Sequence, residues 1–505
     1  MHPTESKPQS RDEWHALAGA LVLPAKAVID GRQTSARSGE TILSVNPATD
    51  APLGEFAACG SGEIDDAVAS ARRAFRDGRW RNKAPAERKA VLLRLADLMR
   101  TEQHRLATME SLDMGKLVRD AAGNDIPSAI SILQWHAEEA DKLYDEAISV
   151  RPGNLAVIRR EPVGVVGAVV PWNFPLNMAI WKCAPALVAG NSVVLKPAEQ
   201  SSYTALRLGA LALEAGLPDG VLNVVPGYGE TAGRALGLHG DVDCLAFTGS
   251  TGVGKMFLTY AGQSNMKQVW LECGGKSPAI VFSDCRDLRQ AARAIAGCIF
   301  YNQGQVCSAT SRVLVEASIA EEFEGLLAEE AARFAIGDPL DPASGLGALV
   351  SDEHQRRVLS YIARGKGEAR LVTGGSADSV NGRGRFVLPT IFADVPPDAA
   401  IAREEIFGPV LCITRFSSEA EAVALANDSI YGLAASVWTD DLNRAHRMID
   451  AISSGLVAVN AADPVSPAVP FGGLRQSGNG RDLSRHAIEK YTALKSAWIH
   501  YSGET

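Results

Sequence analysis

The sequence has no apolar run of the ~20 residues that a helix needs to cross a bilayer. Its first residues, Met1–Lys7, also lack the apolar segment of a secretory signal. Nor is there an excess of positive charge, because the net charge is −9 over 505 residues. A nucleic-acid backbone attracts basic surfaces, so this balance argues against nucleic acid as a main partner. We therefore expect neither a membrane nor a nucleic acid as partner.

The cysteines lack any regular pattern. None of the eight stands in a C-x-x-C pair, so we predict neither a metal site nor a disulfide framework. Most should be small buried apolar side chains in a reducing compartment, which favours a cytoplasmic protein. The eight are Cys59, Cys183, Cys244, Cys273, Cys285, Cys298, Cys307 and Cys412.

The chain is too long to be organised around one core, so we expect two or more domains. Its 46% hydrophobic and 22% charged residues are ordinary for a globular enzyme. Apolar residues recur at helical spacing over 63–75, from Pro85 onward and over 125–144. Strands and helices alternate after Arg151, which predicts a doubly wound α/β domain with parallel strands. Its expected strands are 163–170, 192–195, 221–225 and 244–247, and its expected helices are 178–188, 201–215 and 229–238.

The alternation continues and predicts a second α/β domain. Expected strands at 278–282 and 312–316 alternate with helices at 288–299 and up to about Phe334. Near the C-terminus, residues 487–499 place Tyr491, Leu494 and Trp498 in loose alternation with polar residues. An exposed strand of this kind often pairs with a partner chain.

Two segments about one helix apart carry chemistry. Glu272 precedes Gly274-Gly275 and is flanked by apolar residues, so partial burial should raise its pKa toward that of a useful base. Cys307 follows a polar turn, where a thiol can stay accessible and have its pKa lowered. The alternatives are a buried structural ion pair for Glu272 and an inert core cysteine for Cys307.

Three further features point to a ligand site. Gly249 and Ser250 open a glycine-rich turn between a strand and a helix, where a helix N-terminus favours a pyrophosphate, although an empty tight turn is equally consistent. Lys196 and Glu199 follow a strand end and could contact ribose or phosphate, or form a solvated charge pair. Asn173 lies in a rigid apolar turn and is either an oxyanion donor or a turn cap.

Taken together, these segments resemble the aldehyde dehydrogenase superfamily over residues 29–499. Seven segments match that family's pattern in order: Pro171–Pro175, Lys196–Glu199, Phe247–Thr251, Leu271–Pro278, Asn302–Cys307, Glu404–Pro409 and Pro470–Gly473. The resemblance implies that Cys307 is the nucleophile, Glu272 the general base and Asn173 an oxyanion-hole donor. It also implies a cofactor site made by Trp172, Lys196, Glu199, Gly249, Ser250, Glu405 and Phe407.

The implied reaction is oxidation of an aldehyde to its acid through a thiohemiacetal and a thioester on Cys307. Glu272 would activate the water that hydrolyses the thioester. A carboxylate at Glu199 repels a 2′-phosphate, so NAD is the expected cofactor, with NADP as the alternative. A cofactor-independent thiol esterase or acyl transferase built on Cys307, or a non-catalytic scaffold, would be the competing functions.

The resemblance also implies an organisation in space. Residues 1–143 and 162–273 would form the NAD-binding domain and residues 274–486 the catalytic domain. Residues 144–161 and 487–505 would form a small β element that joins chains into a homodimer or homotetramer. The fold expected is thus two doubly wound α/β domains plus an oligomerisation element.

Within the family, three segments look most similar to bacterial γ-glutamyl-γ-aminobutyraldehyde and guanidinobutyraldehyde dehydrogenases. They are Ser264–Trp270, Trp438–Met448 and Gln476–Asp482, and we expect all three to lie away from the aldehyde pocket. The expected pocket residues are Phe174, Trp181, Asp463 and Phe471. In those relatives the loop before Pro470 tends to carry a Tyr and one or more Asp residues. In this chain the position of the aromatic residue is Ala462 and that of an acid is Ser466. An aminoaldehyde is therefore in competition with a bulkier neutral or aryl aldehyde.

Overall fold

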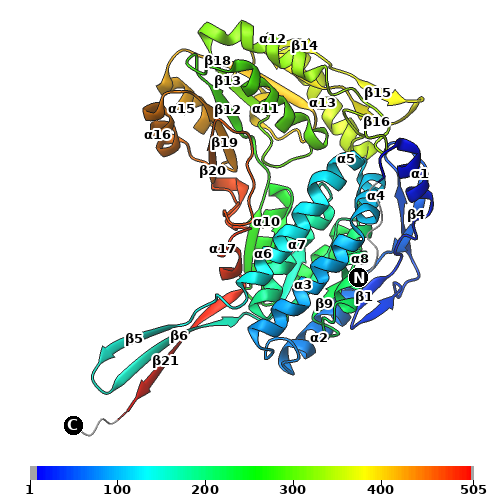
Figure 1. Ribbon diagram of the computed structural model, residues 1–505, viewed down its shortest axis with the longest axis vertical. Coiled ribbons are helices and arrows are strands. Elements are labelled where there is room, and N and C mark those ends of the chain that lie inside the picture. The colour runs from blue at the N-terminus through cyan, green and yellow to red at the C-terminus, as the bar shows by residue number, and fades with distance from the viewer. Residues whose placement is uncertain (1–7, 502–505) are drawn as a thin grey trace.

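The computed structural model describes residues 8–501 and shows two α/β lobes and a projecting β arm (Figure 1). Residues 1–7, considered above for a secretory signal, lie outside the described residues. Among residues 8–501, no helix combines the length and apolar character that crossing a bilayer requires. The predicted fold class, two doubly wound α/β units with a small β element, is confirmed.

The first lobe is built on a seven-stranded sheet in the order β11-β10-β7-β8-β9-β1-β2. Strands β11, β10, β7, β8 and β9 are parallel, and β1 and β2 are antiparallel. The strands are β1 (Ala27–Ile29), β2 (Arg32–Thr34), β7 (Val165–Val169), β8 (Ser192–Lys196), β9 (Leu222–Val224), β10 (Cys244–Thr248) and β11 (Gln268–Glu272). A separate hairpin pairs β3 (Thr41–Val45) with β4 (Pro52–Ala57).

Helices cover both faces of this sheet because successive strand residues point to opposite sides. In β7, Val166 and Ala168 pack into one core, whereas Val165 and Val169 pack into the other. Helices on the first side are α1 (Arg11–Gly19), α3 (Pro85–Thr101), α4 (Gln103–Met114), α5 (Val118–Asp120), α6 (Ile126–Glu139), α7 (Pro175–Ala189) and α8 (Tyr203–Glu214). Helices on the second side are α2 (Ser61–Arg76), α9 (Arg234–Leu238) and α10 (Thr251–Gln263).

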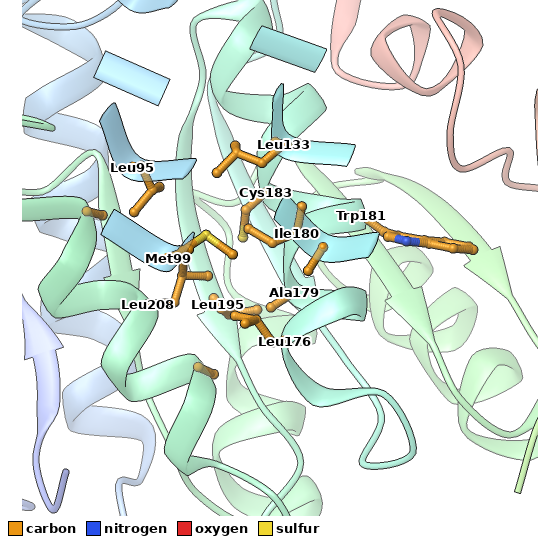
Figure 2. Close-up of a cluster of buried hydrophobic side chains, with 14 of the residues drawn as sticks. Leu95, Met99, Leu133, Leu176, Ala179, Ile180, Trp181, Cys183, Leu195 and Leu208 are labelled. Atoms are coloured by element: carbon orange, nitrogen blue, oxygen red, sulfur yellow. The ribbon is translucent and has the colours of Figure 1, made fainter. Parts of the chain in front are cut away.

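The centre of the first core is α7, an almost entirely buried helix. Its apolar side chains meet Leu95 and Met99 of α3, Leu133 of α6, Leu195 of β8 and Leu208 of α8 (Figure 2). In the same view the indole of Trp181, which is also buried, points away from the other labelled side chains.

The second lobe has its own seven-stranded sheet in the order β14-β17-β18-β13-β12-β19-β20. All its pairings are parallel except β14 with β17. The strands are β12 (Pro278–Val281), β13 (Arg312–Glu316), β14 (Arg370–Thr373), β17 (Thr390–Ala393), β18 (Val410–Phe416), β19 (Ala434–Trp438) and β20 (Leu456–Val459). Its helices are α11 (Leu288–Phe300), α12 (Ala320–Ala331), α13 (Asp352–Glu368), α14 (Ala400–Arg403), α15 (Glu419–Asn427) and α16 (Leu442–Ala451), with a hairpin of β15 (Ala377–Val380) and β16 (Arg383–Val387).

The arm is a three-stranded antiparallel sheet in the order β21-β6-β5 that extends away from both lobes (Figure 1). It consists of β5 (Glu146–Arg151), β6 (Asn154–Pro162) and β21 (Thr492–His500). The C-terminal segment is not one strand from residue 487, because the short helix α17 (His486–Glu489) precedes β21. Strand β21 pairs with β6 of the same chain and leaves Leu494 and Trp498 exposed.

Further elements differ from the sequence-based expectations or were not covered by them. The helix expected at 229–238 begins as a π-helix, Gly229–Gly233, and becomes α-helical only over α9. No prediction covered α4, whose residues are almost all buried. An amphipathic stripe is the signal for a helix, and a helix that is buried all round has none.

Candidate active site

A cavity of about 720 Å³ lies where the ends of the strands of the two lobes meet, within the range of small-molecule sites. Of the predicted site residues, Lys196 and Glu199 alone do not line it. The predicted residues in its wall are Trp172, Asn173, Phe174, Trp181, Gly249, Ser250, Glu272, Cys307, Glu405, Phe407, Asp463 and Phe471.

Glu272 is the last residue of β11 and is 4% exposed. Neither of its carboxylate oxygens has a hydrogen-bond partner among residues 8–501, so the structural ion pair considered above is not formed. Burial, reinforced by the charge of Asp482, raises its pKa well above the usual range, against the opposing effect of Lys182. A Cβ on Gly480 would lie 2.9 Å from Oε1, so a glycine there leaves the carboxylate its space.

Cys307 lies in a turn in which the N–H of Ala309 bonds to the carbonyl of Val306 at 3.2 Å. The preceding segment is a tight loop in which Asn302 and Gln303 both have positive φ, 48° and 59°. Within residues 8–501, no hydrogen-bond partner is found for the Cys307 backbone N–H. That donor therefore remains free to bind an oxygen in the cavity.

The expectation of a lowered thiol pKa is wrong. Burial raises the pKa of Cys307, and the charges of Asp463, Glu405 and Glu272 raise it further. The polar turn before Cys307 is visible in the sequence, but the three carboxylates that the fold places near the thiol are not. A proton acceptor or a higher pH is therefore needed to form the thiolate.

Asn173 lies between β7 and α7, and its side chain is held on the Cys307 loop. Its Nδ2 donates to the carbonyl of Gln305 at 2.9 Å, while Asn302 Nδ2 donates to the carbonyl of Asn173 at 3.0 Å. An amide nitrogen has two hydrogens, so one remains for the cavity that Asn173 lines. Asn173 thus joins two loops rather than capping its own turn.

Gly249 and Ser250 lie at the N-terminus of α10, where the carbonyl of Glu272 accepts a bond from the Gly249 N–H at 3.1 Å. A Cβ on Gly249 would lie 2.5 Å from the ring of Phe247 in β10, so any larger residue at this position would clash with that ring. The Thr248 hydroxyl is buried without a partner among the described residues and lines the cavity. Free helix N–H groups and an unpaired hydroxyl suit a phosphate or ribose ligand.

Lys196 and Glu199 form a charge pair of 2.9 Å next to the Trp172 loop. Lys196 is 3% exposed whereas the Glu199 side chain is 26% exposed, so the pair is buried on the lysine side and partly open to solvent on the glutamate side. The Lys196 carbonyl accepts from Val170 N–H, which joins this strand end to the segment that leads to Trp172. The pair therefore lies beside the cavity wall, on the carboxyl edge of the first sheet.

Glu405 and Phe407 come from the second lobe. Glu405 Oε1 accepts a bond from the Gly275 N–H at 3.0 Å, and burial raises the pKa of Glu405 to about 7. Trp172 contacts Phe407 edge to face with ring centres 5.3 Å apart. His354 contacts both rings and its Nε2 lies 2.7 Å from the carbonyl of Phe407.

His354 and Arg357 of α13 line the cavity but were not identified from the sequence. They lie far from the other motifs along the chain, and no glycine-rich turn marks them. A histidine on an amphipathic helix gives no separate signal. Burial lowers the pKa of His354 to about 4, so the ring is neutral near pH 7.

Aromatic side chains line the other end of the cavity. Phe174 stacks on Tyr301 with centres 6.1 Å apart, and Trp181 meets Phe471 edge to face at 5.2 Å. Trp181 Nε1 donates to Asn177 Oδ1 at 3.0 Å, which fixes the orientation of the buried indole seen in Figure 2. These rings form flat apolar walls.

One expectation about distance from the pocket is wrong. The segment Gln476–Asp482 runs against β11, where Cys273 N–H bonds to the Ser477 carbonyl at 2.8 Å. Asp482 lines the cavity and is paired with the buried cations Lys182 and Lys490. This pairing was not predicted, because Lys182 stands 300 residues from Asp482 in an apolar helix, and Lys490, eight residues after Asp482, belongs to no recognisable motif.

The sequence was compared with families of known proteins. The model of the aldehyde dehydrogenase family matches residues 34–497. The chain belongs to the aldehyde dehydrogenase family. This confirms the predicted family, and the nucleophile and base expected of an aldehyde dehydrogenase, Cys307 and Glu272, face the same cavity.

Similar aldehyde dehydrogenases are found among bacterial proteins. The NADP/NAD-dependent aldehyde dehydrogenase PuuC of Escherichia coli is 52% identical over 96% of this chain and 98% of that protein. AldA indole-3-acetaldehyde dehydrogenase of P. syringae, solved with NAD+ and IAA, is 50% identical with a TM-score of 0.97, covering 98% of this chain and 100% of that one. A γ-glutamyl-γ-aminobutyraldehyde dehydrogenase of Burkholderia cenocepacia is 50% identical with a TM-score of 0.96, covering 97% and 100%. The predicted resemblance to that bacterial group is confirmed.

Proposed function

We propose that Cys307, Glu272 and Asn173 carry out the oxidation of an aldehyde to its carboxylic acid with NAD or NADP. The observation that carries this proposal is the meeting of a thiol, an unpaired carboxylate and an amide donor in one cavity. Cys273 and Cys298 also line the cavity, but of the three thiols Cys307 lies in the loop to which Asn173 is hydrogen-bonded. The competing cofactor-independent thiol esterase has no comparable support, since the chain belongs to a dehydrogenase family.

The proposed steps follow from the positions of these groups. The Cys307 thiol gives its proton to water in the cavity, the thiolate sulfur adds to the aldehyde carbon, and the oxygen that becomes negative is bound by the N–H groups of Asn173 and Cys307. Bound NAD(P) would supply the acceptor for the hydride that leaves the same carbon, and the carbon would then be held on Cys307 as a thioester. Glu272 then takes a proton from water, the hydroxide oxygen attacks the thioester carbon, and Cys307 leaves with the acid released.

The proposed cofactor residues lie along one path. The N-terminus of α10 with Gly249 and Ser250 suits the pyrophosphate, and Glu405 with Phe407 and Trp172 would hold the nicotinamide ribose and ring. Lys196 and Glu199 would bind the adenosine ribose. Because Lys196 already neutralises part of the Glu199 charge, repulsion of a 2′-phosphate is weakened, which is consistent with use of both NAD and NADP.

The substrate proposed is an aldehyde that carries nitrogen a few bonds from its carbonyl carbon. The relatives named for γ-glutamyl-γ-aminobutyraldehyde and indole-3-acetaldehyde support this class. The flat walls formed by Phe174, Trp181 and Phe471 also accept an aryl group. An aryl aldehyde is therefore the second candidate.

We also keep the predicted organisation as part of the proposal. The arm would join chains into a homodimer or homotetramer, because Leu494 and Trp498 are exposed on one face of β21. The domain division at residues 143, 161, 273 and 486 agrees with the two sheets and the arm as separate structural units. A reducing, cytoplasmic location fits eight free thiols, all of which lie within residues 8–501.

The test is a steady-state assay of reduced nicotinamide formed from a panel of aminoaldehydes, aliphatic aldehydes and aryl aldehydes. Cys307→Ala should abolish turnover with every aldehyde. Cys285→Ala, which removes a buried thiol elsewhere in the second lobe, is the matched control and should stay within about twofold of wild type. Nicotinamide reduction by Cys307→Ala at the wild-type rate would rule the proposal out.

A further inference from the structure

The cavity is lined by five carboxylates, and most have protein partners. Asp125 is paired with Lys116 and accepts from the Tyr301 hydroxyl at 2.5 Å, while Asp482 is held by two lysines. Glu405 accepts from the Gly275 N–H. Among the described residues, Glu272 and Asp463 are the cavity carboxylates that have buried oxygens without a partner. Glu272 is already assigned as the base, so Asp463 remains to be explained.

Asp463 is held at one oxygen and unsatisfied at the other. The Ser308 hydroxyl donates to Oδ2 at 2.7 Å, whereas Oδ1 is buried and has no partner among residues 8–501. The backbone of Asp463 has φ 45°, a left-handed conformation that non-glycine residues rarely adopt. A buried acceptor without a donor is unfavourable, so this oxygen is suited to a donor that arrives with a ligand.

The position of Asp463 places such a donor close to the reacting carbon. Ser308, its hydrogen-bond partner, directly follows Cys307. The charge of Asp463 acts on the thiols of both Cys307 and Cys298, and raises the pKa of each after burial. The carboxylate therefore lies near the nucleophile and near the face of α11 that carries Cys298.

There is also room for a substrate group beside it. Ala294, Gly297 and Cys298 form one face of α11 in the cavity wall, at the i, i+3 and i+4 spacing of a helix. A Cβ built on Gly297 would meet no atom within 4 Å. The loop that carries Asp463 presents the small side chain of Ala462 to the same cavity. Small side chains therefore leave space on the side of the cavity where Asp463 is found.

We propose that Asp463 Oδ1 accepts a hydrogen bond from an N–H group of the substrate, and that Asp463 thereby selects aldehydes with nitrogen a few bonds from the carbonyl carbon. This inference rests on the proposed function of the same cavity. The N–H can belong to an ammonium, which also gains the attraction of the carboxylate charge, or to a neutral amide or indole. Similar enzymes tend to carry an acidic residue where this chain has Ser466. Asp463, which follows Ala462, would recognise the same substrates without that acid.

The experiment compares matched substrates in wild type and variants. The ratio of kcat/KM for β-aminopropanal to that for butanal, its uncharged isostere, should be at least about tenfold in wild type, since hydrogen bonds to charged groups are the stronger kind. Asp463→Ala should reduce the ratio to about one, because any change that loss of the charge makes at Cys307 affects both substrates alike. Asp463→Asn keeps an acceptor oxygen without the charge, so it should lose the preference for β-aminopropanal but retain indole-3-acetaldehyde.

Two further results keep the test decisive. Ser308→Ala removes the bond to Oδ2 and leaves Oδ1 in place, so the substrate ratio should persist. If Ser308→Ala and Asp463→Ala lose the ratio equally, or if both substrates decline together in Asp463→Asn, Asp463 only shapes its loop and the inference is overturned. Failure of the proposed function would instead be seen as nicotinamide reduction that survives Cys307→Ala, whatever the ratio.

Discussion

The side-chain nitrogen of Asn173 donates to the backbone carbonyl of Gln305 at 2.9 Å, so a residue of the first lobe is bound to the loop that carries Cys307 in the second. A second bond, from Asn302 Nδ2 to the Asn173 carbonyl at 3.0 Å, runs in the opposite direction. Asn173, the proposed oxyanion donor, and Cys307, the proposed nucleophile, are therefore held at a fixed separation even if the lobes shift relative to one another.

Asn173→Ala removes both the proposed oxyanion donor and the bond to Gln305. We expect kcat to fall by about 10²–10³-fold, the usual cost of one such donor. Stopped-flow measurement of the first nicotinamide reduction should show that the hydride step itself has slowed. A variant with normal single-turnover rates would show that Asn173 has only a structural role, and the thermal midpoint tells loss of folding from loss of chemistry.

Glu272→Gln separates the two halves of the reaction. Because hydrolysis of the thioester needs the base and acylation of Cys307 uses the thiol, we expect a burst of reduced nicotinamide without steady turnover. Rapid mixing with a good aldehyde measures both phases. The matched change Gly480→Ala leaves the carboxylate in place but puts a methyl group 2.9 Å from Oε1, and should slow steady turnover less severely. Full steady turnover in Glu272→Gln would remove Glu272 from its proposed role.

The pKa of Glu405, raised by burial to about 7, predicts a pH dependence of cofactor binding. A raised pKa means that the carboxylate is present above pH 7 and is lost as the pH falls through that value. A neutral acid accepts ribose hydroxyls less strongly, so KM for NAD should rise as the pH drops below about 7. Initial rates at several pH values measure this rise, and Glu405→Gln should make KM high and nearly independent of pH. A wild-type KM that is flat between pH 6 and 8 would contradict the assignment.

Trp498→Glu tests the role of the arm in assembly. Trp498 is 64% exposed on β21, and a side chain of this size contributes on the order of 2 kcal/mol when an interface covers it. We expect the variant to dissociate toward the monomer, as measured by light scattering during size-exclusion chromatography. Ala493→Glu places the same charge on the opposite face of the strand and should have a smaller effect. An unchanged molar mass in both variants would exclude the arm as the contact.

The sequence predicted most elements as far as residue 334 because they carry clear signals. Alternating apolar runs such as β7 and β8, and the Pro85 that begins α3, need no tertiary information to be recognised. Beyond that point short strands such as β14 and β17 depend on pairing for their identity. The helix α4 was missed because its residues are buried on every side.

For the candidate site, the residues could be predicted from the sequence but their electrostatic surroundings could not. Glu272, Cys307 and Asn173 stand beside glycines, prolines or sharp turns, and such residues are visible in a sequence. The pKa of Cys307 could not be obtained in this way, because it depends on Asp463 and Glu405, which the fold brings close. Long-range charge is a property of the folded chain, and local motifs do not encode it.

Tyr491 lies close to the end of the chain and yet is fully buried in the core of the first lobe. The Lys490 carbonyl and Asp482 also complete contacts with Cys244 and Lys182, which are synthesised much earlier. The strands of the first lobe, which are synthesised earlier, therefore stay incompletely covered until residues 482–491 have been made. A product that ends before Tyr491 leaves this part of the core exposed, so the segment up to Tyr491 is needed for a closed interior and not merely for assembly.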